Sequence, residues 1–387
     1  MTWYRAGSRL DPPGAAGTAH FLEHMMFKGT KRFGKGEIDR LTARYGGFNN
    51  GFTSYDFTAY CFSFPAGRWR QALEIEADRM IGSLFLPDEF ELEKQVILEE
   101  LKMEQDDPWE MLREAVALEV FKEHPYRFPV AGVVDDVRSL TCRQVEDFYR
   151  TYYVPNNTVL TLVGSLDENR ALDEIERHFG RIPPAELPPD KSPSEPQPER
   201  LRRIEVSRPS PVSRLLIAWP VPPFDPSEFA VIEVADQILA GGKLSRLYRR
   251  LLERKPLLSL LTSEYAESRD PYVYTLRMEL KEDAEVDAVE EVVFEEMYRL
   301  ADSDPTAEEM ERAVTRSIVQ FIGDLETTFD QAFQLGISEV LGHGNFVREY
   351  AAHLRSVAPE QIVQLVKRSL QREKATIAVM KRTDHCC

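Results

Sequence analysis

Cysteine is scarce in this sequence, and long apolar runs are missing. The cysteines are too few and too scattered for a disulfide framework and lack the paired C-x-x-C spacing of a zinc ribbon; they are Cys61, Cys142, Cys386 and Cys387. No stretch approaches the roughly 18 consecutive apolar residues that a membrane-spanning helix needs. These absences argue against a small disulfide-stapled domain and predict no membrane span.

Positive charge is also in deficit. The 387 residues carry 65 acidic and 48 basic side chains, and this net charge of -17 is opposite in sign to what neutralising nucleic-acid phosphates requires. We therefore expect no nucleic-acid partner. The length and a hydrophobic content of 43% predict a globular protein of two or three domains.

Hydrophobic periodicity predicts an α/β order in the first half of the chain. Helical spacing covers 37–45, 68–84, 88–106, 141–152 and 169–179, and strand patterns cover 52–64 and 158–164. From 181 onward the composition becomes so rich in proline that an extended spacer is expected. We place a first domain at 1–185 and a linker at 186–213.

Residues 214–387 repeat this order of elements. A strand is predicted at 214–219, a helix at 229–239 and a terminal strand at 375–380, which echoes 158–164. The predicted fold class is α+β: two homologous α/β domains, each a mostly antiparallel sheet packed by helices, joined by the proline-rich linker.

The run His20-Phe-Leu-Glu-His24 is the most informative segment. On a helix, positions i and i+4 lie one above the other, so both imidazoles can reach one metal ion, with Glu23 beside them. Chance would place this pattern in a chain of this composition about once in a hundred. Unpaired histidines on an otherwise apolar face would also be costly to bury. A catalytic zinc site is therefore predicted, and it still needs a third ligand.

The acidic helix predicted at 88–106 offers candidates for the third ligand. Val96, Ile97 and Leu101 mark its expected core face, and most of its carboxylates must be solvated. Spacing alone does not choose between Glu99 and Glu100.

The segment Gly17-Thr-Ala-His-Phe-Leu-Glu-His-Met-Met-Phe-Lys-Gly-Thr30 resembles the inverted-zincin site of the pitrilysin/insulinase metallopeptidases, and most closely the branch related to mitochondrial processing peptidase. Similar landmarks span nearly the whole chain; they are Gly47-Phe-Asn-Asn-Gly-Phe-Thr-Ser54, Glu93-Lys-Gln-Val-Ile-Leu-Glu-Glu100, His124-Pro-Tyr-Arg127, Tyr152-Tyr-Val-Pro-Asn-Asn157 and Gly241-Gly-Lys-Leu-Ser-Arg-Leu247. The resemblance implies one half of a clamshell that closes around an unfolded peptide.

Roles at the site follow from this resemblance. It implies that His20, His24 and Glu100 bind one zinc ion, and that Glu23 activates the attacking water and returns its proton to the leaving amine. Glu93 would orient a ligating imidazole, as metal-bound histidines usually require.

The resemblance also implies a substrate-binding edge strand, to which a peptide adds as a further strand. Its residues are Asn50, Gly51, Phe52 and Thr53. Gly51 stands where the family usually has alanine, and glycine loosens a strand. A simple turn at Asn50 and Gly51 remains the alternative.

The second half departs from the family pattern. Active members usually carry an arginine and a tyrosine seven residues apart after the glycine-rich segment, where this chain has Leu252 and Ser259. The nearby arginines and Tyr265 do not pair at that spacing, so surface charge is their expected role. We expect a homodimer or heterodimer in which a related subunit supplies the missing pair.

The N-terminal segment also differs from the family pattern, because family members usually have about one more strand before the position of Thr2. Bacterial relatives are often exported, so the prediction is periplasmic if a leader is missing and cytoplasmic otherwise.

The sequence thus predicts a zinc endopeptidase that acts on unfolded peptides. A non-catalytic scaffold or binding subunit of the same fold is the main alternative. A third hypothesis is a zinc hydrolase of small amides, which would need a compact substrate pocket. No motif in the sequence indicates such a pocket.

Overall fold

The computed structural model describes residues 1–196 and 198–383, which form two compact units built from exchanged segments. Unit 1 comprises Met1–Glu104, Phe128–Lys191 and Leu325–Gly344; unit 2 comprises Gln105–Arg127, Ser192–Asp324 and the chain from Asn345 onward. The chain passes from unit 1 to unit 2 at 191/192, inside the linker predicted at 186–213. The sequential domain limits themselves remain a prediction.

Unit 1 contains a four-stranded antiparallel sheet in the order β2-β3-β1-β4. Its strands are β1 (Thr2–Tyr4), β2 (Phe48–Thr53), β3 (Thr58–Ser63) and β4 (Thr158–Leu160). β2 lies at the edge, and among the described strands it pairs with β3 alone.

The single strand predicted at 52–64 is wrong, because this stretch is a hairpin whose first strand begins earlier, at Phe48. The Ser54 N–H donates to the Phe57 carbonyl and reverses the chain, while apolar alternation continues across the turn and hides it in the sequence. The strand predicted at 158–164 ends at Leu160, although Thr161 still pairs with Met1 through backbone hydrogen bonds.

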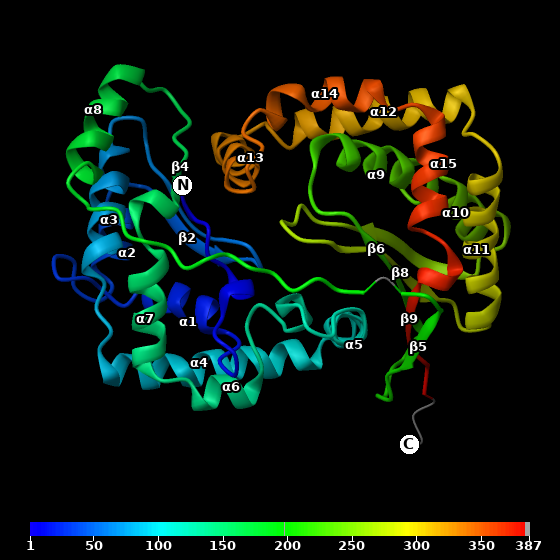
Figure 1. Ribbon diagram of the computed structural model, residues 1–387, viewed down its shortest axis with the longest axis horizontal. Helices are drawn as coiled ribbons and strands as arrows, with labels where there is room; N and C mark the ends of the chain where they lie inside the picture. The colour runs from blue at the N-terminus through cyan, green and yellow to red at the C-terminus, as the bar shows by residue number, and fades with distance from the viewer. Residues whose placement is uncertain (197, 384–387) are drawn as a thin grey trace. The chain divides into compact units, whose positions relative to one another are not determined.

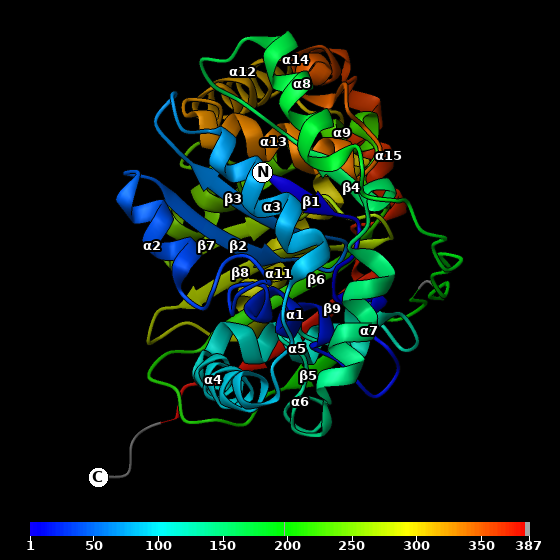
Figure 2. The ribbon, with the colours of Figure 1, turned by 90° about the vertical axis from the view of Figure 1, so that its left-hand side faces the viewer.

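Helices pack on both faces of this sheet. They are α1 (Thr18–Met25), α2 (Glu37–Arg44), α3 (Arg70–Gly82), α4 (Pro87–Asp106), α6 (Val134–Ser139), α7 (Cys142–Tyr152), α8 (Glu168–Phe179) and α13 (Thr328–Val340), with 3-10 turns η1 (Ser8–Leu10) and η3 (Pro155–Asn157). α1 and α4 lie side by side (Figure 1), and α3 covers the near face of the sheet in Figure 2.

The two sheet faces bury different cores. Tyr4 and Tyr60 face the cluster that contains Phe21 and Ile97 of α1 and α4. Trp3 points to the opposite face, where α13 covers it. Trp3 and α13 are more than 300 residues apart in the sequence. A Cβ on Gly336 of α13 would meet the Trp3 indole at 2.1 Å, so glycine permits this close approach.

Unit 2 contains a five-stranded sheet in the order β5-β9-β6-β8-β7, in which β5 and β9 are parallel and all other pairs are antiparallel. The strands are β5 (Arg202–Glu205), β6 (Arg214–Val221), β7 (Leu258–Glu264), β8 (Tyr272–Leu280) and β9 (Thr376–Met380). The helices are α5 (Pro108–Val120), α9 (Pro226–Leu239), α10 (Arg246–Tyr248), α11 (Val286–Asp302), α12 (Ala307–Gly323), α14 (Phe346–Ser356) and α15 (Pro359–Arg368). Two 3-10 turns, η2 (Pro125–Arg127) and η5 (Arg372–Lys374), and a π-helix, η4 (Arg249–Arg254), complete the unit.

The predicted fold class is confirmed, because each unit is a mostly antiparallel sheet packed by helices. Part of the extended linker predicted at 186–213 belongs to a sheet: β5 lies inside it, in a proline-free stretch between Pro198 and Pro209, and pairs with β9. Cys61 and Cys142 are free, whereas Cys386 and Cys387 lie outside the described residues. None of the described helices combines the length and apolar character needed to cross a membrane.

Candidate metal centre

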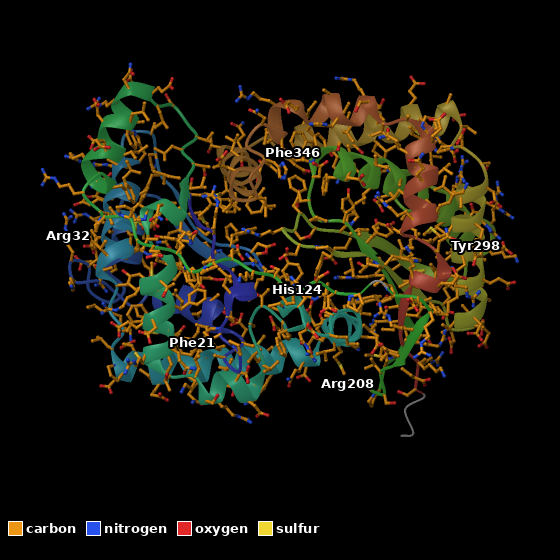
Figure 3. All side chains as sticks on the ribbon, in the orientation of Figure 1. Phe21, Arg32, His124, Arg208, Tyr298 and Phe346 are labelled. Carbon is orange, nitrogen blue, oxygen red and sulfur yellow. The ribbon has the colours of Figure 1, made fainter. Side chains whose placement is uncertain are left out.

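The N-terminal end of α1 is held by a buried carboxylate. Asp11 accepts hydrogen bonds from the backbone N–H groups of Gly17 at 2.7 Å and Ala19 at 2.8 Å, which satisfies donors that a helix start leaves free. Gly17 has a φ of 99° and no room for a side chain, since a Cβ would lie 2.6 Å from the Ala131 carbonyl. The Phe21 ring (Figure 3) stacks on Phe90 of α4 at 4.4 Å. Capping and packing therefore fix the direction in which the neighbouring face of α1 points.

That face carries His20 and His24, one turn apart, with ring centroids separated by 4.7 Å. One nitrogen of each ring and one carboxylate oxygen of Glu100 on α4 all lie within 4.8 Å of one another. Glu99 forms an ion pair with Lys102 on the solvent side instead. The structure therefore brings Glu100, and not Glu99, to the histidines.

Glu93, two turns before Glu100 on α4, lies behind His24. Its Oε1 is 2.8 Å from His24 Nδ1, and its Oε2 forms an ion pair with Lys28. Burial opposes ionisation of Glu93, but the bonds from His24 and Lys28 prevail and lower the pKa of this carboxyl. An ionised carboxylate only accepts, so Nδ1 of His24 is the donor and Nε2 can face a metal.

The predicted core face of α4 is right in part. Ile97 and Leu101 are buried, but Val96 is 52% exposed. The inward stripe runs through Glu93, Ile97, Glu100 and Leu101, and Val96 falls outside it.

Glu23 meets the edge strand β2. The Thr53 hydroxyl donates to Glu23 Oε2 at 2.7 Å, and a Cβ on Gly51 would lie 3.0 Å from Glu23 Oε1. Gly51 therefore leaves space beside the carboxylate that the family's usual alanine would fill. Thr53, predicted as a substrate contact, has its hydroxyl engaged with Glu23.

The electrostatics of the histidines differ. Burial, reinforced by the nearby His24, lowers the pKa of His20 to about 3, so this imidazole is neutral at physiological pH. Burial acts in the same direction on His24, but the hydrogen bond to Glu93 and the carboxylates of Glu23 and Glu100 outweigh it and raise the pKa of His24. Burial also raises the pKa of Glu23. Metal ligation requires each imidazole to present an unprotonated nitrogen to the ion.

These residues fit a zinc ion. Two imidazoles and one carboxylate form a ligand set of catalytic zinc sites, and a further carboxylate, Glu23, stands beside them. The Nδ1 atom of His20 is buried without a hydrogen-bond partner. Across residues 1–196 and 198–383, no other cluster of three or more such side chains has this spacing.

The predicted substrate residues share strand β2 but not one environment. Asn50 is exposed and pairs with Cys61 of β3, whereas the Phe52 ring packs against Trp3 and Phe333 in the core. The outer edge of β2 is unpaired with any described strand, so its backbone is available for β-augmentation. Asn50 and Gly51 lie within the strand, so the simple-turn alternative is wrong.

In unit 2, Leu252 lies in η4 and Ser259 is exposed on β7, where its hydroxyl donates to the Glu279 carbonyl. Tyr265 is half-buried: its hydroxyl donates to a Glu233 carboxylate oxygen, and burial raises the pKa of the phenol.

Sequence reasoning missed Lys28 and the bond between Thr53 and Glu23. Lys28 lies four residues after His24, a spacing that places both side chains on one side of the chain at this point. This spacing could have indicated that both contact the same residue of α4, which is Glu93. The Thr53 contact joins two elements and left no pattern in the sequence.

Two family models match the chain. A model described as insulinase (peptidase family M16) covers residues 2–133, and one described as peptidase M16 inactive domain covers 139–317. Among curated proteins, the zinc protease PqqE of Helicobacter pylori is 28% identical over 85% of this chain and 75% of its own length. An uncharacterized zinc protease of Streptomyces coelicolor is 26% identical over 98% of this chain and 83% of its own length.

Solved structures share the fold. A protease from Helicobacter pylori matches with a TM-score of 0.91 at 24% identity, covering 98% of this chain and 93% of that one. A peptidase M16 inactive domain from Pseudomonas fluorescens matches with a TM-score of 0.88 at 20% identity, covering 99% and 92%.

Proposed function

Because the chain belongs to the insulinase family of peptidases, family M16, we propose that it is a zinc-dependent endopeptidase that hydrolyses unfolded peptides. The observation that carries the proposal is the convergence of donor atoms from His20, His24 and Glu100 within 4.8 Å, with Glu23 held beside them. A protein that only needed the fold would have no reason to keep two imidazoles and two carboxylates together on one partly buried face.

Each residue of the cluster has a separate task in this proposal. His20, His24 and Glu100 would hold the zinc ion, which would supply a Lewis acid to polarise a peptide carbonyl and to acidify the attacking water. Glu23 accepts a proton from the attacking water on its carboxylate and delivers it to the leaving amine. The Thr53 hydroxyl holds one oxygen of Glu23 and leaves the other free for this transfer. Glu93 keeps Nδ1 of His24 protonated, so Nε2 remains the ligand.

The substrate would bind as an added strand along the free edge of β2. Backbone pairing to Asn50 and Gly51 would supply affinity without reading side chains, which suits unfolded peptides of varied sequence. Since Gly51 lies against Glu23, a peptide on this edge would have its backbone near the base.

A related subunit would complete the enzyme. The periplasmic protease PqqL of Escherichia coli has this fold, and the present chain covers 44% of that protein but 86% of its first half. One PqqL chain is thus long enough for two such halves. This relation supports a dimer in which the partner supplies the arginine and tyrosine replaced here by Leu252 and Ser259.

A non-catalytic scaffold subunit is the second candidate. It is favoured by the match of residues 139–317 to the inactive-domain model and by Leu252 and Ser259. The intact cluster on α1 and α4 favours the peptidase.

Cleavage of a quenched fluorescent peptide by the zinc-loaded chain distinguishes the two candidates. The chain is assayed alone and mixed with a related subunit that lacks the H-x-x-E-H run. Activity that requires the mixture and disappears with Glu23→Gln supports the shared-site peptidase. Activity of the chain alone, abolished by the same change, keeps the peptidase and removes the need for a partner. No cleavage in either sample, despite one zinc per folded chain, would support the scaffold.

A further inference from the structure

Lys28 reaches the candidate metal centre through one intermediary. It follows the C-terminal end of α1, and its Nζ forms an ion pair with Oε2 of Glu93 while Oε1 of Glu93 accepts from His24 Nδ1. The side chain of Glu93 is 8% exposed and that of Lys28 22%. The three residues thus form a chain of contacts from a partly exposed ammonium to an imidazole of the site.

We propose that Lys28 is a positioning residue of the metal centre: it holds Glu93 so that Glu93 fixes the ring of His24 and stays out of the metal's own ligand shell. The proposal rests on the zinc site proposed above and assigns a role to a side chain outside the ligand set.

The geometry gives Glu93 two competing options that Lys28 removes. Glu93 and Glu100 are seven residues apart on the inward stripe of α4, so a Glu93 with a free oxygen could rotate toward a metal ion held by Glu100. It could also turn to solvent and release His24. The ion pair occupies Oε2 and leaves Oε1 only the bond to His24.

The charges around the cluster point the same way. Three carboxylates, from Glu23, Glu93 and Glu100, gather around the site, and a dication balances only two of them. In the part of the chain that the structure describes, Lys28 is the one lysine or arginine that forms an ion pair with any of the three. Its ammonium therefore brings the loaded site close to neutrality, which buried charges require.

The competing explanation is that the Lys28–Glu93 ion pair only stabilises the packing of the end of α1 on α4. A second lysine–glutamate ion pair to α4 serves as a matched control. Lys35, in the loop after α1, also forms an ion pair with a glutamate of α4, Glu89, but this pair touches none of the cluster residues. Lys28→Met and Lys35→Met each break one lysine–glutamate tie to the same helix, and only the first disturbs Glu93.

The test is the zinc dissociation constant of the full chain, measured by competition with a chromogenic chelator. We expect zinc binding about tenfold weaker in Lys28→Met, close to wild type in Lys28→Arg, and unchanged in Lys35→Met. Equal affinity of Lys28→Met and wild type would overturn the proposal, and so would an equal loss in Lys35→Met.

A double variant keeps the test decisive if Lys28→Met folds poorly on its own. In Glu93→Gln the side chain has a single acceptor oxygen and can no longer bridge Lys28 and His24, so adding Lys28→Met should weaken zinc binding by less than about twofold. An additional tenfold loss would overturn the proposal. Failure of the wild-type chain to bind zinc would instead contradict the zinc site itself, so the two failures are distinguishable.

Discussion

The helices α1 and α9 occupy the same place in their units, but their polar side chains are used differently. Each follows a sheet strand, β1 or β6, and precedes a hairpin, β2–β3 or β7–β8. In unit 2 the carboxylates of α9 are satisfied internally: Glu233 accepts from the hydroxyls of Tyr265 and Ser317, and Asp236 accepts from Tyr274 at 2.8 Å.

On α1 the polar groups keep unused capacity. Nδ1 of His20 has no partner, and Glu100 approaches Nε2 of His24 only to 3.7 Å. The same order of strand, helix and hairpin therefore carries two kinds of polar cluster. In unit 2 hydroxyl groups satisfy the carboxylates of α9, a closed cluster, whereas in unit 1 the cluster on α1 keeps donor atoms free for a ligand. The two helices present different side chains in this shared order of elements, so the order of elements does not by itself specify the chemistry.

Glu23→Gln should produce the largest effect. Glutamine fills the same space and can still meet Thr53, but it cannot accept a proton, so kcat should fall by about a thousandfold or more. Zinc binding should be retained because Glu23 is outside the proposed ligand set. Steady-state cleavage and zinc titration of one preparation check both points; substantial residual activity would remove Glu23 from the mechanism.

Glu100→Gln should come next, with Glu99→Gln as its control. Loss of one ligand should weaken zinc binding by more than about a hundredfold, whereas Glu99, which pairs with Lys102 at the surface, should be replaceable without loss. Chelator competition measures both. Equal behaviour of the two variants would mean that the third ligand has been misassigned.

Asp236→Asn should reveal how the closed cluster of unit 2 responds to pH. Burial, partly offset by hydroxyl hydrogen bonds, raises the pKa of Asp236 from 3.8 to about 6. The folded protein therefore retains a proton that the unfolded chain releases, and wild type loses up to about 3 kcal/mol of stability as pH rises through this window.

Asparagine does not titrate, so Asp236→Asn should gain stability relative to wild type between about pH 4 and 6, as measured by urea unfolding. The exposed Asp283→Asn serves as control and should follow the wild-type profile. A parallel profile for Asp236→Asn would show that Asp236 is ionised in the folded protein.

Thr53→Val should have the smallest effect. Loss of its hydroxyl leaves Glu23 without the hydrogen bond that orients it, and kcat should fall about tenfold with zinc binding unchanged. Thr53→Ser should restore most of the activity. If serine and valine behave alike, the methyl group and not the hydroxyl matters.

Sequence patterns predicted the features of the site that depend on the residues of a single helix. His20, Glu23 and His24 were readable because their spacing places them on one face of α1, and α4 was predicted within one residue at each end. The choice of Glu100 over Glu99 depends on which face of α4 packs toward α1, and no local pattern encodes that packing.

Contacts between distant segments could not be predicted. The packing of α13 on β1 brings together residues more than 300 positions apart, and the assignment of α5 to unit 2 depends on the same kind of exchange. Thr53 was read as a substrate contact because the resemblance describes the strand as a whole, whereas its hydroxyl bond depends on how β2 meets α1.

The position of α13 in unit 1 also has a consequence for biosynthesis. Residues 1–191 contain the whole sheet of unit 1 and all residues of the candidate metal centre, yet the face around Trp3 stays open until 325–344 have left the ribosome. By then most of unit 2 has been synthesised. A nascent chain therefore cannot complete unit 1 first, and a fragment cut at the linker would expose an apolar face to aggregation or to chaperones.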